Sequence, residues 1–195
     1  MSFHQTKMPF VLASGSPRRK ELLTTLGFPF EVFVSDADES FPEDFSPKLV
    51  PALLAERKAE VVLQIKPDSL ILASDTVVVL EDLILNKPAD ETEARMMLKA
   101  LSGNTHFVYT AFSLMHKNGK ITITDRADVT FKSLSSQEIE YYLTNGKPFD
   151  KAGAYGIQEW IGLIAVERIE GSYFTVMGLP THLLWQELMT GGFLI

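Results

Sequence analysis

The chain has 195 residues, and its 18 Lys and Arg against 25 Asp and Glu give a formal net charge of −7. It contains no cysteine, which excludes disulfides, a thiolate nucleophile, an iron–sulfur cluster and a cysteine zinc site. A hydrophobic fraction of 46% is too high for a disordered chain. The acidic balance argues against a general nucleic-acid binder. We expect a single domain over residues 1–195.

The first third of the chain predicts two strands and two helices. Apolar runs predict strands at residues 9–13 and 30–34. Pro17 begins a helix that Gly27 ends. A longer helix is predicted over residues 47–65, and its apolar positions include Leu49, Leu53, Val61 and Ile65.

The middle of the chain is dominated by one apolar run. Residues 69–73 predict a buried central strand. Ser74 and Asp75 are expected to interrupt this strand, which then resumes over residues 76–80 and has a hairpin partner at 83–85.

The remaining elements follow from capping and turn signals. Two capping boxes predict helices over residues 94–101 and 136–144. The Asn118-Gly119 pair predicts a hairpin between strands 105–116 and 120–131. The last elements predicted are a strand over 161–169 and a helix over 178–189. The alternation predicts a mixed α/β fold.

No apolar stretch approaches the roughly 18 residues of a membrane span. The apolar run near the start of the chain is also shorter than the core of a signal peptide. We therefore expect a cytoplasmic protein without a membrane partner.

The first candidate site is the turn Ser14-Gly15-Ser16-Pro17-Arg18-Arg19, with Ser16 placed to cap the helix that follows. Free backbone N–H groups at the start of a helix favour an anion. The hydroxyls of Ser14 and Ser16 and the guanidinium groups of Arg18 and Arg19 would add donors for phosphate oxygens. The alternative is an ordinary capped helix with two solvated arginines.

The second candidate is a pair of carboxylates. Asp75 follows an apolar strand, which is where open α/β folds place functional groups, and it could act as a general base or hold Mg²⁺. Glu39, in an acidic loop, could be a second metal ligand. The alternatives are a turn-capping aspartate and a solvated glutamate.

The third candidates are Lys58 on the long helix, Lys87 before a proline, and the glycine-containing loop 151–158. The amide of Gln158 offers both a donor and an acceptor that could read the edge of a base. Surface lysines and a mobile loop are the alternatives. The four histidines show no metal-ligand spacing. From the residues alone, the candidates describe an enzyme or a binder for a phosphorylated small molecule.

Together, these segments resemble the Maf family of nucleotide pyrophosphatases over residues 11–188. Each piece is weak alone, but their order is specific. The pieces that carry the resemblance are residues 12–19, 38–39, 58–59, 73–76, 86–88, 101–103, 150–158, 171–173 and 178–180.

The resemblance implies an elongated mixed sheet flanked by helices, related to the inosine-triphosphate pyrophosphatases, with a cleft between two lobes. It implies hydrolysis of a nucleoside triphosphate between its α and β phosphates. It also implies a divalent cation, Mg²⁺ with Mn²⁺ or Co²⁺ as substitutes, a cytoplasmic location and a homodimer.

Carried over by position, the resemblance makes Asp75 the proton acceptor and Glu39 a ligand of metal or water, so that Glu39 and Asp75 form the metal site. It assigns Ser14, Arg19, Lys58 and Lys87 to the triphosphate.

Three further positions favour the branch of the family that hydrolyses dTTP and UTP. They are Arg18, Thr76 and Gln158. The alternatives are a 7-methyl-GTP pyrophosphatase and a nucleotide-binding regulator of cell division that does not hydrolyse. The sequence departs from the family where Glu159 stands in place of the usual glycine and Thr175 in place of a frequent asparagine.

Overall fold

The computed structural model describes residues 5–42, 44–146 and 148–194. Contacts divide the chain into two compact units. The strands β3, β5 and β6 each have residues in both units. The first unit comprises residues 1–75, 110–125 and 178–195, and the second comprises residues 76–109 and 126–177. The expectation of a single domain stays a prediction.

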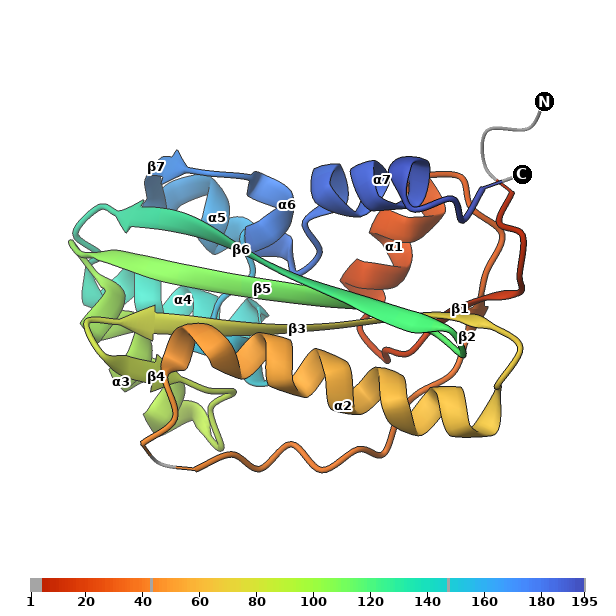
Figure 1. Ribbon diagram of the computed structural model, residues 1–195. Helices are drawn as coiled ribbons and strands as arrows, with labels where there is room; N and C mark the ends of the chain where they lie inside the picture. Colours follow the sequence, from red (N-terminus) through yellow and green to blue (C-terminus); the bar gives the residue numbers. More distant parts are fainter. Residues whose placement is uncertain (1–4, 43, 147, 195) are drawn as a thin grey trace. The chain divides into compact units, whose positions relative to one another are not determined.

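In the part of the chain that the structure describes, seven strands form one mixed sheet in the order β2-β1-β3-β5-β6-β7, with β4 added to β3 (Figure 1). β1 lies parallel to both β2 and β3, whereas β4 is antiparallel to β3 and β7 antiparallel to β6. The strands are β1 Phe10–Leu12, β2 Glu31–Val32, β3 Leu70–Leu80, β4 Leu83–Leu85, β5 Thr105–His116, β6 Gly119–Phe131 and β7 Val166–Glu170.

The α-helices among the described residues are α1 Pro17–Thr25, α2 Val50–Ile65, α3 Glu91–Leu101, α4 Ser136–Gly146, α5 Trp160–Ala165, α6 Tyr173–Met177 and α7 Thr181–Thr190. Short 3₁₀ turns occupy Pro47–Leu49, Pro148–Asp150 and Ala152–Ala154. Within the described ranges, none of these helices combines the length and the apolar character needed to cross a bilayer. The mixed α/β fold predicted from the sequence is confirmed.

The core of the first unit forms where α2 covers β1 and β3. Ala59 and Val62 of α2 are fully buried against Val11, Ile71 and neighbouring apolar side chains. The apolar positions cited from the sequence do not make up the buried face, because Leu49 and Ile65 are about half exposed. The buried face of α2 consists instead of Val50, Pro51, Leu54, Ala55, Ala59 and Val62.

The core of the second unit contains a buried histidine that packs against two larger aromatic side chains. His106 is fully buried, with its ring edge-on to Phe131 and Tyr155 at centroid distances of 5.0 and 5.4 Å. Its Nε2 lies 2.8 Å from the Tyr155 hydroxyl. Its Nδ1 has no hydrogen-bond partner in the described part of the chain. Burial lowers the pKa of His106 to about 4.

The sequence predicted that Ser74 and Asp75 interrupt the central strand, and this prediction is wrong. β3 runs without a break from Leu70 to Leu80. The two polar residues stay in the strand because each finds a partner there: the Ser74 hydroxyl donates to the Gly178 carbonyl, and Asp75 pairs with Lys58.

The strand predicted over residues 161–169 is also wrong in its first half. Residues 160–165 form α5, and only Val166–Glu170 form β7. A helix of six residues is too short to display a 3.6-residue period, so its apolar run reads as a strand. The last predicted helix begins at Thr181 rather than 178, and the short helix α6 precedes it.

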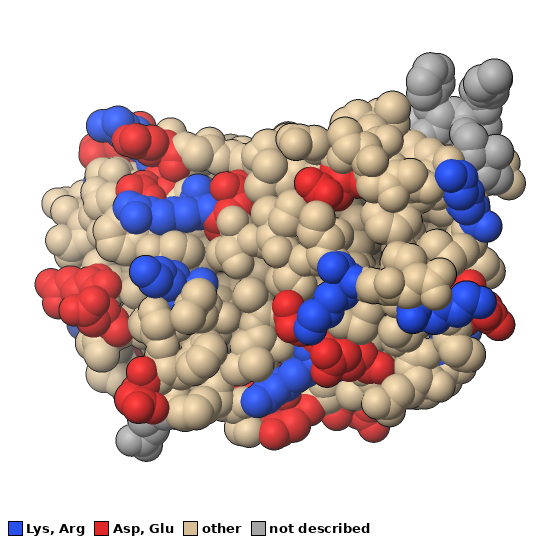
Figure 2. All heavy atoms as spheres, viewed as in Figure 1, with Lys and Arg blue, Asp and Glu red and all other residues tan. Residues whose placement is uncertain are grey.

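Positive and negative side chains alternate over the face shown in Figure 2. Ion pairs also join charged side chains within the first unit: Lys120 Nζ of β6 lies 2.6 Å from Glu56 Oε2 of α2, and Lys117 Nζ lies 3.1 Å from Asp68 Oδ1. The viewed face therefore carries no broad field of a single sign.

Because His106 is held neutral, we expect folding stability to depend on pH. Below about pH 6.5 the unfolded chain takes up a proton that the folded chain does not, so the free energy of unfolding decreases until about pH 4. At pH 5 the loss is roughly 2 kcal/mol.

Denaturant unfolding at pH 7 and pH 5 measures this difference. His106→Gln should abolish this part of the dependence. Tyr155→Phe, which leaves the histidine buried, should retain it. An unchanged difference in His106→Gln would show that other groups are responsible.

Candidate functional site

The turn before α1 is organised by the first of its serines. The Ser14 hydroxyl accepts a hydrogen bond from the Ser16 N–H at 3.2 Å. Ser16 occupies the N-cap position, but its side chain makes no capping hydrogen bond, and Pro17 opens the helix. The first turn of α1 is therefore not capped by Ser16, and its N–H groups point toward the space in front of the helix.

Arg19 is held on both sides by neighbours in the first unit. Its Nε donates to the Gly178 carbonyl at 2.8 Å and its Nη1 to the Ser14 hydroxyl at 3.2 Å. Burial lowers the pKa of the guanidinium; the charges of Asp75 and Glu39 oppose this shift, whereas Arg18 adds to it. Arg19, Arg18 and both candidate carboxylates thus share one electrostatic neighbourhood.

The Gly178 carbonyl accepts two hydrogen bonds that the sequence analysis did not predict. Besides Arg19 Nε, it accepts the hydroxyl of Ser74 at 3.0 Å. Ser74 is fully buried. The one available signal was a polar residue inside an otherwise apolar run, directly before Asp75.

Lys58 brings the two candidate carboxylates together. Its Nζ lies 2.6 Å from Asp75 Oδ1 and 2.8 Å from Glu39 Oε1. The side chains of Lys58 and Asp75 are each 13% exposed, whereas that of Glu39 is 56% exposed. Lys58 can reach both carboxylates because the next residue, Ala59, anchors α2 in the core. The structure thus brings these three candidate residues together around one ammonium group.

The loop that carries Glu39 is tied to α2 by a residue that sequence reasoning missed. Arg57 Nη1 donates to the backbone carbonyls of Asp38 and Ser40, on either side of Glu39. The carboxylate of Asp38 accepts hydrogen bonds from the N–H and hydroxyl of Ser40, which lower its pKa. The lone arginine on an amphipathic helix offered no signal of this contact.

The carboxylates fit a divalent cation of the magnesium type. No group of three or more His, Cys, Asp or Glu side chains arranged for a metal occurs among residues 5–42, 44–146 and 148–194. Mg²⁺ is nevertheless commonly held by one or two carboxylates, with water and substrate phosphates completing its shell. Glu39 and Asp75 supply such a pair, since both reach the same ammonium group.

The other predicted site residues belong to the second unit. Thr76 follows Asp75 directly in β3. Lys87 and Gln158 are exposed, and neither side chain has a hydrogen-bond partner among the described residues. Their segments are joined, because the Gly153 N–H donates to the Asn86 carbonyl at 3.2 Å.

The fold is shared with the Ham1 protein of Staphylococcus aureus. The two structures superpose with a TM-score of 0.54 over 94% of this chain and 99% of the other, at 13% sequence identity. The protein is thus an α/β protein of Ham1-like fold, with a lysine–carboxylate centre in the same electrostatic neighbourhood as Arg19 of α1. Residues 9–190 match the family model described as Maf-like protein, and the chain belongs to that family.

Three curated relatives of the chain share one name. Proteins named dTTP/UTP pyrophosphatase are 46% identical in Porphyromonas gingivalis, over 95% of this chain and 96% of that protein. In Cytophaga hutchinsonii the identity is 43%, over 95% and 85% of the two chains. In Bacillus cytotoxicus it is 46%, over 92% and 93%.

We expect Lys58 to contribute to folding because its loss leaves a poorly exposed carboxylate without its partner. Lys58→Met should lower the free energy of unfolding by about 1–3 kcal/mol. Lys117→Met, which removes an ion pair whose side chains are 58% and 83% exposed, should cost less than about 1 kcal/mol. Equal losses in the two variants, measured by denaturant unfolding, would contradict this account.

Proposed function

We propose that this protein hydrolyses dTTP and UTP to the nucleoside monophosphate and pyrophosphate. The observation that carries the proposal is Asp75, a carboxylate fixed in the central strand by Lys58 and accompanied by Glu39. Support for the substrates comes from relatives named dTTP/UTP pyrophosphatase, which are 43–46% identical over nearly the whole chain.

Asp75 is the proton acceptor in this proposal. Lys58 occupies its Oδ1, which leaves Oδ2 to accept a proton from the attacking water. The water oxygen bonds to the α phosphorus, while the bond between the α phosphorus and the bridging oxygen breaks. The bridging oxygen and its electron pair leave with pyrophosphate.

The cations neutralise the polyphosphate. Charge that develops on the leaving pyrophosphate is stabilised best by donors already in position. Arg19 is such a donor, since its Nε and Nη1 are both held in place. Ser14, Arg18 and Lys87 complete the set proposed for the phosphates. Lys58 contributes by orienting both carboxylates.

Glu39 and Asp75 would hold the divalent cation. When bound, such a cation neutralises phosphate charge and polarises the phosphoryl oxygens. Since both carboxylates already contact the Lys58 ammonium, the cation would share them with it.

Arg18, Thr76 and Gln158 are proposed to select the base. The Gln158 amide can donate to one group and accept from another, which suits the alternating donor and acceptor on the edge of uracil or thymine. Its exposed side chain is available for such contacts. A homodimer in the cytoplasm completes the proposal, and light scattering after gel filtration tests the dimer.

The direct test is pyrophosphate release with Mg²⁺ from dTTP, UTP, CTP, GTP and 7-methyl-GTP. We expect release from dTTP and UTP, and a decrease of about 10²–10⁴-fold in Asp75→Asn, which keeps a partner for Lys58 but is a poor base. Asp68→Asn, at an 83% exposed position, is the control. Preference for 7-methyl-GTP would overturn the substrate assignment, and activity in Asp75→Asn would overturn the base.

Lys87 should matter for turnover and not for folding. Its side chain is exposed, so Lys87→Ala should leave the melting temperature unchanged while kcat/KM for UTP falls by about 10-fold or more. Lys99→Ala, also exposed and on α3, is the matched control. Equal activity of the two variants would remove Lys87 from the site.

A further inference from the structure

Gln158 lies in a four-residue turn. The Glu159 N–H donates to the Gly156 carbonyl at 3.0 Å, which closes the turn Gly156–Glu159 with Gln158 as its third residue. Gly156 and Ile157 are buried, whereas Gln158 is exposed. The direction in which the amide leaves the surface is therefore set by the backbone of this turn.

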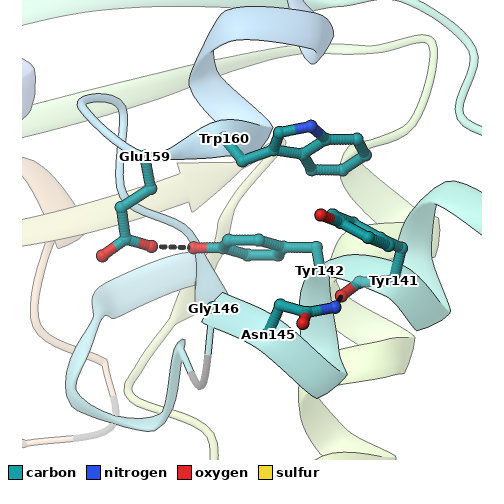
Figure 3. Close-up of a pocket in the computed structure, with 6 residues that line it drawn as sticks. All are labelled: Tyr141, Tyr142, Asn145, Gly146, Glu159 and Trp160. Atoms are coloured by element: carbon teal, nitrogen blue, oxygen red, sulfur yellow. Dashed lines mark hydrogen bonds between the residues drawn. The ribbon is translucent and has the colours of Figure 1, made fainter.

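One phenol oxygen binds both ends of that turn. The Tyr142 hydroxyl accepts a hydrogen bond from the Gly156 N–H at 3.1 Å and donates one to Glu159 Oε2. Figure 3 shows the carboxylate of Glu159 and the hydroxyl of Tyr142 pointing at each other, while Tyr141 and Trp160 lie farther along the same pocket. The first and last residues of the turn are thus fixed to a single atom of α4.

The second oxygen of the carboxylate is also held. Lys151 Nζ lies 3.0 Å from Glu159 Oε1 and 2.6 Å from Asp150 Oδ1. Lys151 is buried. Since both carboxylate oxygens have partners, the side chain of Glu159 is fixed in one orientation.

The surroundings keep these groups in place. Tyr142 is 1% exposed, and burial, followed by its hydrogen bond to Glu159, raises the pKa of its phenol. The hydroxyl therefore stays protonated and can donate. A Cβ at residue 156 would lie 2.8 Å from Glu159 Cδ and 3.0 Å from Lys151 Cε, so a larger residue there would displace the Glu159 carboxylate from this position.

We infer that Glu159 is a positioning residue for substrate specificity, which acts through Tyr142 and the Gly156–Glu159 turn to position Gln158. The inference rests on the proposed function, in which Gln158 reads the base. Because the Gln158 side chain makes no hydrogen bond among the described residues, its position depends on the turn, which sets the direction of its Cα–Cβ bond. When Gln158 binds a base, a turn that is already fixed loses less entropy than a mobile turn, and it discriminates better between bases.

The test compares variants that break this arrangement with one that does not. Glu159→Ala and Tyr142→Phe each remove one side of the hydrogen bond. Tyr141→Phe, at the neighbouring exposed tyrosine, is the matched control. kcat and KM are measured for UTP and GTP, and the melting temperature is measured for each variant.

We expect Glu159→Ala and Tyr142→Phe to raise KM for UTP and to lower the UTP-to-GTP ratio of kcat/KM by about 10-fold, with kcat within about twofold of the wild type. The double variant should lose about 10-fold and not 100-fold, because both changes break the same arrangement. Glu159→Gln, which still accepts from the hydroxyl, should recover part of the ratio. Tyr141→Phe should match the wild type.

An unchanged ratio in folded Glu159→Ala, or independent losses in the double variant, would overturn the inference. Titration calorimetry of UTP and GTP in the Asp75→Asn background separates it from the proposed function. Selective UTP binding that Glu159→Ala abolishes supports the inference even if the wild type releases no pyrophosphate. Failure of UTP and GTP to bind selectively would overturn it.

Discussion

A carboxylate in the middle of a central strand requires a partner, and this requirement organises the first unit. Asp75 interrupts a run of buried residues in β3 that continues on both sides, with Ala73 and Val77 at most 5% exposed. Lys58 provides the compensating charge. Two kinds of interaction therefore hold α2 in position: the apolar contacts of Ala59 and Val62, and the ion pair of Lys58 with Asp75. Glu39 joins the same charge from a loop.

The sequence was sufficient where short-range patterns decide the structure. The hairpin at Asn118-Gly119 forms as predicted, and both capping boxes cap a helix, through Asp90 and Ser135, although α3 begins at Glu91 rather than at residue 94. It failed where long-range contacts decide: β3 continues through Ser74 because a carbonyl 104 residues away accepts its hydroxyl. For the site, the chemistry of the charged residues could be recognised, and Lys58, Asp75 and Glu39 do meet. The neutral groups that hold these residues, such as the Gly178 carbonyl, could not be recognised, because every residue has a backbone carbonyl and the sequence does not show which one accepts a hydrogen bond.

The candidate residues divide into two kinds. Arg19, Lys58 and Asp75 are already engaged within the protein, so their positions cost little to maintain when a substrate arrives. Lys87 and Gln158 extend into solvent from backbone segments that are themselves joined by a hydrogen bond. The charged groups of the first kind are already held in position before a substrate binds. The side chains of the second kind are free to form their contacts when it binds.

The hydroxyl of Tyr142 is donor to one residue and acceptor from another, so two contacts depend on one atom. Such an arrangement has a consequence for evolution. In a lineage where position 159 becomes glycine, the hydroxyl at position 142 loses its acceptor, and phenylalanine becomes less costly there. The two positions are therefore expected to vary together among related sequences, although 16 residues separate them, whereas position 141 should vary independently of both.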